Sequence, residues 1–143
     1  MTKKAYVSAC LRALAVTLCL SACSAPEKKE EAALVAGRDA VIPCRERFHE
    51  QGQTYLDCVM YVADSGVRQQ AEAPWRRLGV LYTGWVHADL ASQQGDADAT
   101  RAAQVLLAAS TLQQRELSAD DDRLCPLVDL PCATLNQRRY SSH

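Results

Sequence analysis

Cysteine is the residue whose chemistry is most informative in this chain. Four cysteines lie beyond residue 40, namely Cys44, Cys58, Cys125 and Cys132. Thiols can pair as disulfides, act as nucleophiles or simply lie buried, and none of these four makes a CxxC motif. An even number of cysteines favours two disulfides when a domain is exported, because the compartment outside the cytoplasm is oxidising. Whether the chain is exported is therefore the first question.

The first 23 residues are typical of an export signal. A basic segment, residues 1–12, precedes the apolar run 13–20 (ALAVTLCL), which is too short to cross a bilayer about 30 Å thick. The run closes with Leu20-Ser21-Ala22-Cys23, which resembles the lipobox of bacterial lipoproteins. In that class the cysteine is acylated and becomes the first residue of the mature protein. The alternative is an ordinary cleaved signal peptide in which Cys23 is incidental.

The resemblance implies a lipid-anchored protein. Residues 1–22 would be the signal peptide, and Cys23 would carry the palmitate-type anchor that binds the lipid bilayer. Each buried methylene of such a chain contributes roughly 0.8 kcal/mol, so two or three chains hold firmly. In Gram-negative lipoproteins an aspartate after the cysteine is associated with retention in the inner membrane. Ser24 stands there instead, which favours the outer membrane and its periplasmic face.

Composition limits the class of the mature protein. Removal of residues 1–22 leaves 121 of the 143 residues, enough for one domain with a modest core. Of the 16 Lys and Arg residues, three lie in the leader, so 13 remain against 17 Asp and Glu, a net charge of about −4. A nucleic-acid-binding domain needs a basic surface that displaces counterions. We therefore expect no nucleic-acid partner.

A charged segment follows the proposed anchor. The run Glu27-Lys28-Lys29-Glu30-Glu31 has mixed, well-solvated charges, and Gly37 is a natural helix terminator. We expect residues 23–38 to form the lipidated N-terminus and a tether. Residues 39–143 would then form the folded domain.

The apolar residues of the domain recur with helical period. Three helices are predicted: one over Ile42–Asp64, one beginning near Ala73, and one from Asp96 or Asp98 to about Leu117. The stripe of the last helix is Ala102, Val105, Leu106, Ala109 and Leu112. The fold class expected is all-α: a small antiparallel three-helix bundle with an extended C-terminal segment stapled by two disulfides.

The second and third helices weakly resemble a tetratricopeptide-type hairpin. Trp75-x2-Leu78-Gly79-x2-Tyr82 matches the start of that repeat, and Gln94-Gly95-Asp96 resembles its turn. The turn comes about ten residues late, however, and the pattern occurs once, whereas a solenoid needs several stacked copies. The Trp and Tyr residues are therefore expected to lie in the core.

The cysteine spacing predicts how the C-terminal segment is held. Prolines in Cys125-Pro126…Pro131-Cys132 favour an extended path, in which seven residues reach at most about 23 Å. On a continuous helix, Cys44 and Cys58 are about 21 Å apart along the axis. The matching lengths favour the pairs Cys44–Cys132 and Cys58–Cys125. Cys44–Cys58 with Cys125–Cys132 is the alternative, and it requires a break near Gly52.

Few residues suggest catalysis. The histidines His49, His87 and His143 are far apart in sequence, and no HExxH, GxSxG or phosphate-binding glycine loop occurs. A Cys44–His49 nucleophile and base would be poorly placed on a helix. Asp120-Asp121-Asp122 with Asp129 nearby favours a solvated helix start over a cation site. We expect no enzyme activity, no cofactor and no metal site.

Two function classes remain open. The first is a membrane-anchored periplasmic lipoprotein with a non-catalytic role in protein interaction or envelope assembly, bound to a protein partner. The second is an inhibitor or immunity-type lipoprotein that acts against a toxin or lytic enzyme. The sequence contains no motif that separates them.

Overall fold

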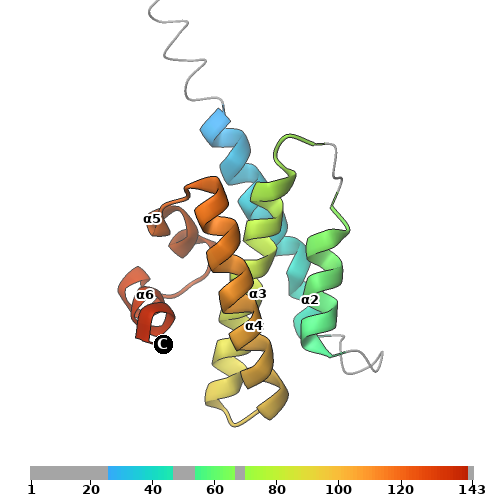
Figure 1. Ribbon diagram of the computed structural model, residues 1–143, viewed down its shortest axis with the longest axis vertical. Helices are drawn as coiled ribbons and strands as arrows, with labels where there is room; N and C mark the ends of the chain where they lie inside the picture. The colour runs from blue at the N-terminus through green and yellow to red at the C-terminus, as the bar shows by residue number, and fades with distance from the viewer. Residues whose placement is uncertain (1–25, 47–53, 67–69, 142–143) are drawn as a thin grey trace, which may run out of the picture.

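The chain forms an all-α bundle. A computed structural model describes residues 26–46, 54–66 and 70–141 (Figure 1). Every regular element in these ranges is helical, and two disulfides link them, as the fold-class prediction requires. Four longer helices, including one over residues 26–46, pack side by side, and shorter helices of the C-terminal part cover one face.

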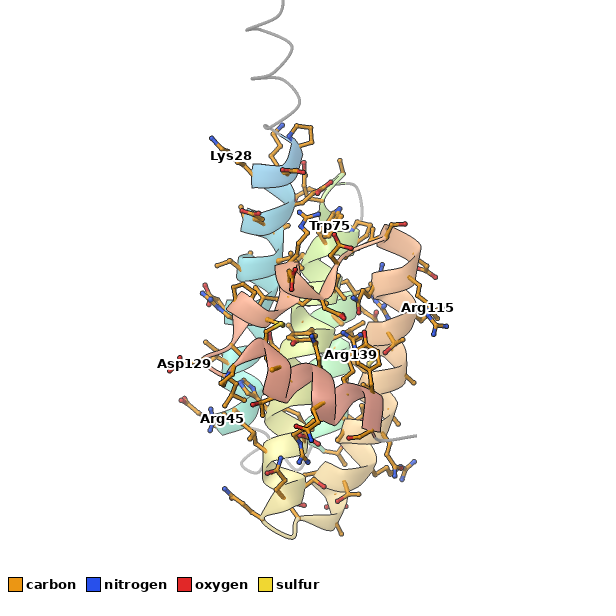
Figure 2. The ribbon with its side chains drawn as sticks, turned by 90° about the vertical axis from the view of Figure 1, so that its left-hand side faces the viewer. Lys28, Arg45, Trp75, Arg115, Asp129 and Arg139 are labelled. Atoms are coloured by element: carbon orange, nitrogen blue, oxygen red, sulfur yellow. A yellow bond between two sulfur atoms is a disulfide. The ribbon has the colours of Figure 1, made fainter. Side chains whose placement is uncertain are left out.

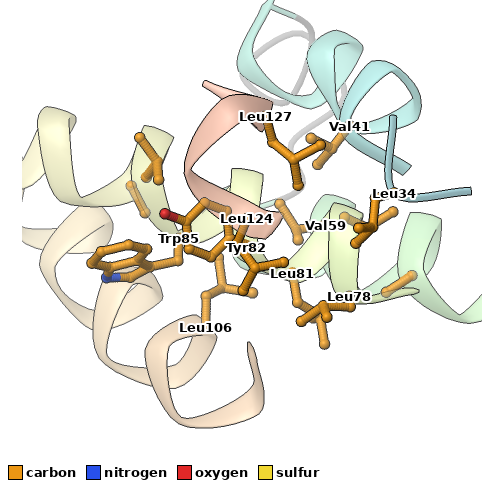
Figure 3. Close-up of a cluster of buried hydrophobic side chains, with 14 of the residues drawn as sticks. Leu34, Val41, Val59, Leu78, Leu81, Tyr82, Trp85, Leu106, Leu124 and Leu127 are labelled. Carbon is orange, nitrogen blue, oxygen red and sulfur yellow. The ribbon is translucent and has the colours of Figure 1, made fainter. Parts of the chain in front are cut away.

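Helix α3 (Ala73–Gln93) is the centre of the bundle. Every residue from Leu78 to Val86 is buried, because other elements pack against α3 over most of its surface in this stretch. Figure 3 shows Leu78, Leu81, Tyr82 and Trp85 of α3 among side chains of the other elements. The predicted start of this helix near Ala73, with Pro74 in its first turn, is confirmed.

Helices α3 and α4 (Ala97–Leu117) form the predicted antiparallel hairpin. Gly95 turns the chain with a φ of 90°, and the Asp96 side chain caps α4 by accepting a hydrogen bond from the Ala99 amide. The predicted apolar stripe is only half right. Val105 and Leu112 are exposed, Leu112 by 60%, because α4 faces the core through a neighbouring row. That row is Ala99, Ala102, Ala103, Leu106, Ser110 and Gln113.

The helix over residues 26–46, called the N-terminal helix below, corrects the predicted tether. It continues past Gly37 to residue 46, and its side chains Leu34 and Val41 lie in the core. Gly37 does not end the helix, because here a glycine serves close packing. A Cβ at residue 37 would clash with the Arg76 carbonyl oxygen of α3. The folded body therefore includes residues that the sequence assigned to a spacer.

Helix α2 (Tyr55–Asp64) is separate from the N-terminal helix, so the predicted single helix over Ile42–Asp64 is wrong. The Thr54 side chain caps α2 by accepting a hydrogen bond from the Asp57 amide at 3.1 Å. This Thr-x-x-Asp pattern is a helix-start signal of the capping-box type. The N-terminal helix and α3 run in one direction, and α2 and α4 run in the other (Figure 1).

The reversal of the chain between the first two helices overturns the predicted disulfide pairing. Cys44 pairs with Cys58, with Cα atoms 5.6 Å apart, and Cys125 pairs with Cys132, with Cα atoms 5.1 Å apart. The predicted pairs Cys44–Cys132 and Cys58–Cys125 assumed a continuous helix beside an extended strand-like segment. Neither condition holds, so each cysteine finds its nearer neighbour in sequence.

The C-terminal part is helical where an extended segment and a loose tail were predicted. It comprises α5 (Asp121–Leu124), the 3₁₀ turn η1 (Cys125–Leu127) and α6 (Cys132–Ser141). Pro126 lies in the first turn of η1, where a proline is compatible with helix. This path folds back on itself within seven residues, which lets Cys125 meet Cys132.

Helix α6 is docked largely by polar contacts. The Arg139 side chain, only 2% exposed, donates to Thr111 Oγ1 at 3.2 Å and pairs with Asp121 at 3.5 Å. Its guanidinium lies 5.6 Å from the centre of the Tyr82 ring. Leu135 is the buried apolar residue of α6. Figure 2 shows Arg139 pointing from α6 toward the central helices.

Several predictions fall outside the described residues. They are the signal peptide of residues 1–22, Leu20-Ser21-Ala22-Cys23, Ser24, Phe48, His49, Gly52 and His143. Within residues 26–46, 54–66 and 70–141, no helix combines the length and the apolar character that a membrane span requires.

Candidate ligand-binding groove

A groove runs along the second half of α3. It has a volume of about 590 Å³, and we call it the His87 groove. Its floor is formed by α3, one wall by the N-terminal helix and the other wall by the segment after η1. The lining residues are Arg38, Ile42, Arg45, Glu46, Thr83, Val86, His87, Leu90, Leu127, Val128, Asp129 and Leu130.

The helical repeat of α3 sets the floor of the groove. Thr83, Val86, His87 and Leu90 are spaced by three and four residues, so they lie on one face of the helix. The remaining faces of α3 pack against α2, α4 and the first half of the N-terminal helix. The groove therefore exists because the N-terminal helix and the C-terminal segment leave this face of α3 partly uncovered.

A second, smaller hollow adjoins the groove. It has a volume of about 240 Å³ and extends from Arg45 and His87 toward the α3–α4 turn. Tyr55 of α2 lines it, and its hydroxyl donates to the Gly84 carbonyl oxygen at 3.2 Å. Burial raises the pKa of Tyr55, which keeps the phenol neutral. Arg45 and His87 thus stand where the two hollows meet.

His87 is neutral at physiological pH. Burial and, as the smaller cause, the nearby Arg45 guanidinium lower the pKa of its imidazole to about 4. Its Nδ1 atom is buried and has no hydrogen-bond partner among the described residues. A buried lone pair without a partner is less unfavourable than a buried N–H, so the proton belongs on Nε2. The half-buried ring therefore presents an N–H donor to the groove.

Thr83 is the second polar residue of the floor. Its side chain is 1% exposed, and Oγ1 has no hydrogen-bond partner within the described ranges. Most buried polar side-chain atoms in folded proteins have such a partner. Two unpaired polar groups thus lie one helical turn apart on the same face, at Thr83 and His87.

The rim of the groove carries positively and negatively charged side chains. Arg38 pairs with Asp39 at 2.9 Å. Arg45 is exposed, and no carboxylate within the described ranges lies at ion-pair distance from it. Glu46 and Asp129 supply negative charge on the two walls. In Figure 2, Arg45 and Asp129 project on the same side of the molecule.

The chemistry that the described lining of the groove offers is that of binding. The cysteines that could supply a nucleophile, Cys44 and Cys58, are joined in a disulfide. No cluster of three or more His, Cys, Asp or Glu side chains within the described part of the chain could hold a metal ion. What the lining offers is hydrogen-bond donors, one unpaired cation and aliphatic surface.

The acidic run considered as a cation site has another role. Asp121 accepts hydrogen bonds from Gln114 Nε2 and from the Tyr140 hydroxyl, both at 2.7 Å, and pairs with Arg139. Its carboxylate therefore holds the C-terminal helices together. The aromatic residues behave as predicted, since Trp75, Tyr82 and Trp85 are all buried in the core.

Sequence reasoning did not identify the groove. The four-residue spacing of Thr83 and His87 places them on one helix face, but the residues beside them belong to the end of the predicted tether, the start of the predicted first helix and the predicted extended staple. Comparison of the chain with protein-family models, curated proteins and solved structures finds no match. The functional argument therefore depends on the residues themselves.

Proposed function

We propose that the protein is a lipid-anchored lipoprotein of the outer membrane, facing the periplasm, with a non-catalytic role in binding a protein partner of the envelope. Leu20-Ser21-Ala22-Cys23 supports the anchor, and acylated Cys23 would hold the protein to the bilayer. The two disulfides fit an oxidising compartment.

The N-terminal helix is the observation that carries the proposal. Residue 26 already belongs to this helix and is only three residues after Cys23, a span of at most roughly 11 Å. Leu34 and Val41 of the same helix are fully buried against the bundle. A lipid at Cys23 would therefore lie three residues before a helix that packs on the core, and this helix would limit how far the domain can move from the bilayer.

With the anchor at Cys23, the same helix would determine which surface faces away from the membrane. Ile42 and Arg45 are 16 and 19 residues after residue 26, which corresponds to roughly 24 and 28 Å along a helix. Figure 2 shows Lys28 near one end of the molecule and Arg45 toward the other. The His87 groove would thus face the periplasm at a distance suited to a protein partner.

Substitution of the lipid site tests the anchor. In cells expressing the full chain, Cys23→Ser is expected to prevent acylation and to release the protein from washed membranes. Cys19→Ser is the matched control, because it also removes a leader thiol but leaves the lipobox intact. Membrane retention of Cys23→Ser, with acyl labelling equal to that of Cys19→Ser, would contradict the anchor.

Site-specific cross-linking tests the partner. A photoreactive residue at Ile42, which is 43% exposed on the groove wall, should cross-link to one envelope protein in living cells. The same residue at Leu112, exposed on α4, should not cross-link to that protein. An assembly role predicts a structural envelope component as the partner. A hydrolase or toxin whose activity rises when the gene is deleted would instead support the inhibitor class.

A further inference from the structure

Arg45 and His87 both offer hydrogen-bond donors to the His87 groove. The Arg45 guanidinium has only N–H donors, and the neutral His87 ring presents Nε2–H. Arg45 and His87 both line this groove and the smaller hollow that adjoins it, so the two groups are close in space. An oxyanion placed between them would receive hydrogen bonds from both and would be attracted by the arginine charge.

The remainder of the lining is largely aliphatic. Val86 and Leu90 form the floor beside His87, and Ile42 stands on one wall. Leu127, Val128 and Leu130 form the opposite wall. Ligand sites commonly have volumes of roughly 300–1,000 Å³, with apolar walls and a few placed polar groups, and this groove has that composition. Its ligand should therefore have an aliphatic body attached to one anionic oxygen group.

The two acidic residues of the rim further restrict the class of ligand that the groove could bind. Glu46, next to Arg45 on the N-terminal helix, and Asp129 lie on opposite walls of the groove. They would repel a second anion and accept hydrogen bonds from N–H groups of a ligand. A polypeptide carries such N–H groups along its backbone, whereas a fatty acid has none. The distance of roughly 24–28 Å between the start of the N-terminal helix and the groove also places it beyond lipids of the anchoring membrane.

We propose that the His87 groove binds a short aliphatic peptide segment of the partner through one carboxylate held by Arg45 and His87. The carboxylate is either the chain terminus or an Asp or Glu side chain. This inference rests on the proposed function, since it assigns the chemistry by which the partner is recognised. Thr83, whose hydroxyl lacks a partner beneath the groove, marks the floor on which the segment would lie.

Peptide titration of the full-length protein in nonionic detergent micelles tests the proposal. Three acetylated probes of alternating Leu and Val are used: one with a free terminal carboxylate, one amidated, and one amidated with an internal Asp. Calorimetry should detect binding of at least one carboxylate probe, and the ¹⁵N signals of the His87 imidazole should shift. The amidated probe without Asp should bind at least about tenfold more weakly than the probe that binds through a carboxylate. It has no carboxylate that could accept charged hydrogen bonds from Arg45 and His87. Comparison of the two carboxylate probes identifies the source of the anion.

Two variants connect binding to the groove. Arg45→Ala should lower the affinity for the carboxylate probe about tenfold or more. Arg101 is an exposed arginine on α4, and Arg101→Ala should leave this affinity unchanged. Ile42→Glu introduces a competing carboxylate on the wall and should also abolish binding, and its exposed position keeps the fold intact.

Three outcomes in which a probe binds would overturn the proposal. They are equal affinity for the amidated and carboxylate probes, unchanged affinity of Arg45→Ala, and tighter binding of dodecanoate than of every peptide, which would make the ligand a lipid acid. Absence of binding by any probe at millimolar concentration also refutes it. None of these results affects the Cys23→Ser and Ile42 cross-linking tests, so failure of the ligand class is distinguishable from failure of the proposed function.

Discussion

Gly79 of α3 lies directly against the backbone of Leu34 in the N-terminal helix. A Cβ at residue 79 would overlap the Leu34 carbonyl oxygen, and a Cβ at Gly37 would overlap the Arg76 carbonyl oxygen on α3. Each helix thus contributes one glycine to a contact in which the two backbones touch. This contact joins the helix that follows the proposed lipid site to the centre of the fold.

Gly79→Ala is expected to destabilise the protein by about 2–3 kcal/mol. The added methyl group meets backbone atoms that cannot rotate away, and overpacking of this kind is unfavourable. The loss should appear even though alanine has the better helix propensity by about 1 kcal/mol. Urea unfolding followed by far-UV circular dichroism measures it.

Gly84→Ala provides the comparison for this prediction. A Cβ at Gly84 would lie 2.8 Å from Val59 Cγ1, a side-chain methyl group that can shift. Gly84→Ala should therefore cost less than Gly79→Ala. A gain in stability from Gly79→Ala would show that the two helices are not in backbone contact.

The sequence predicted the α3–α4 hairpin because its signals are local. Pro74, Gly95 and Asp96 mark helix ends through their own local preferences. The apolar residues of the two helices recur with a period of about 3.6 residues. The N-terminal helix begins at Pro26, which is also a local start signal, but nothing local indicates that this helix docks on the bundle. Its charged start is typical of a spacer, and its docking depends on Gly79, which is 45 residues from Leu34 in sequence.

The C-terminal helix could not be predicted for a different reason. Helix α6 has one buried apolar residue, Leu135, and is held by the buried Arg139, so it shows no apolar period. The start of α2 was predictable in principle, since Thr54 and Asp57 form a helix-start pattern. Recognition of that start would have separated Cys44 and Cys58 into two helices and favoured their pairing.

The candidate groove follows from these missed elements. Thr83 and His87 belong to a helix that was predicted correctly, and their spacing shows that they share a face. Arg45 and Ile42 can be assigned to the groove only when the N-terminal helix is known to pack beside α3. A site built from three segments becomes visible only after all three have been placed.

The two disulfides should differ in their contribution to stability. Cys44–Cys58 spans 14 residues and Cys125–Cys132 spans seven. In the chain-entropy model, loss of the first costs about 3 kcal/mol and loss of the second about 2.5 kcal/mol. Chemical unfolding of the double variants Cys44→Ala/Cys58→Ala and Cys125→Ala/Cys132→Ala measures both values.

Peptide mapping of the non-reduced protein checks the pairing itself. Proteolysis followed by mass spectrometry should yield fragments joined as Cys44–Cys58 and Cys125–Cys132. Recovery of Cys44 linked to Cys132 would instead support the nested arrangement expected from a continuous first helix.

The buried Arg139 is expected to be replaceable by an apolar side chain of similar length. Its Nε and Nη1 atoms have no hydrogen-bond partner among the described residues, so its desolvation is incompletely compensated. Asp121 would keep its bonds from Gln114 and Tyr140 if the arginine were removed. Arg139→Met should therefore change the free energy of unfolding by less than about 1 kcal/mol.

Two further variants define the contribution of side-chain length and position. Arg139→Ala leaves a cavity beside Tyr82 and should cost about 2–4 kcal/mol, more than Arg139→Met. Arg138→Met removes an exposed ion pair with Asp89 and should cost under about 1 kcal/mol. A loss from Arg139→Met as large as that from Arg139→Ala would show that the buried charge itself is required.

His87 makes stability depend on pH in a defined window. Its pKa is about 4 in the folded protein, against 6.5 for the free side chain, because burial and Arg45 disfavour the charged ring. Between pH 6.5 and 4 the unfolded chain therefore binds a proton that the folded chain does not. Folded stability is complete above pH 6.5 and falls as the pH drops to 4, by on the order of 2 kcal/mol for this partly buried group.

His87→Gln isolates this contribution from the carboxylates, which titrate in both proteins. The difference in unfolding free energy between the parent and His87→Gln should be constant above pH 6.5 and should shift in favour of the variant as the pH falls toward 4. Titration of the His87 ring by NMR measures the folded pKa directly. A midpoint near 6.5 would mean that the ring is freely solvated and would contradict the burial of His87 between the two hollows.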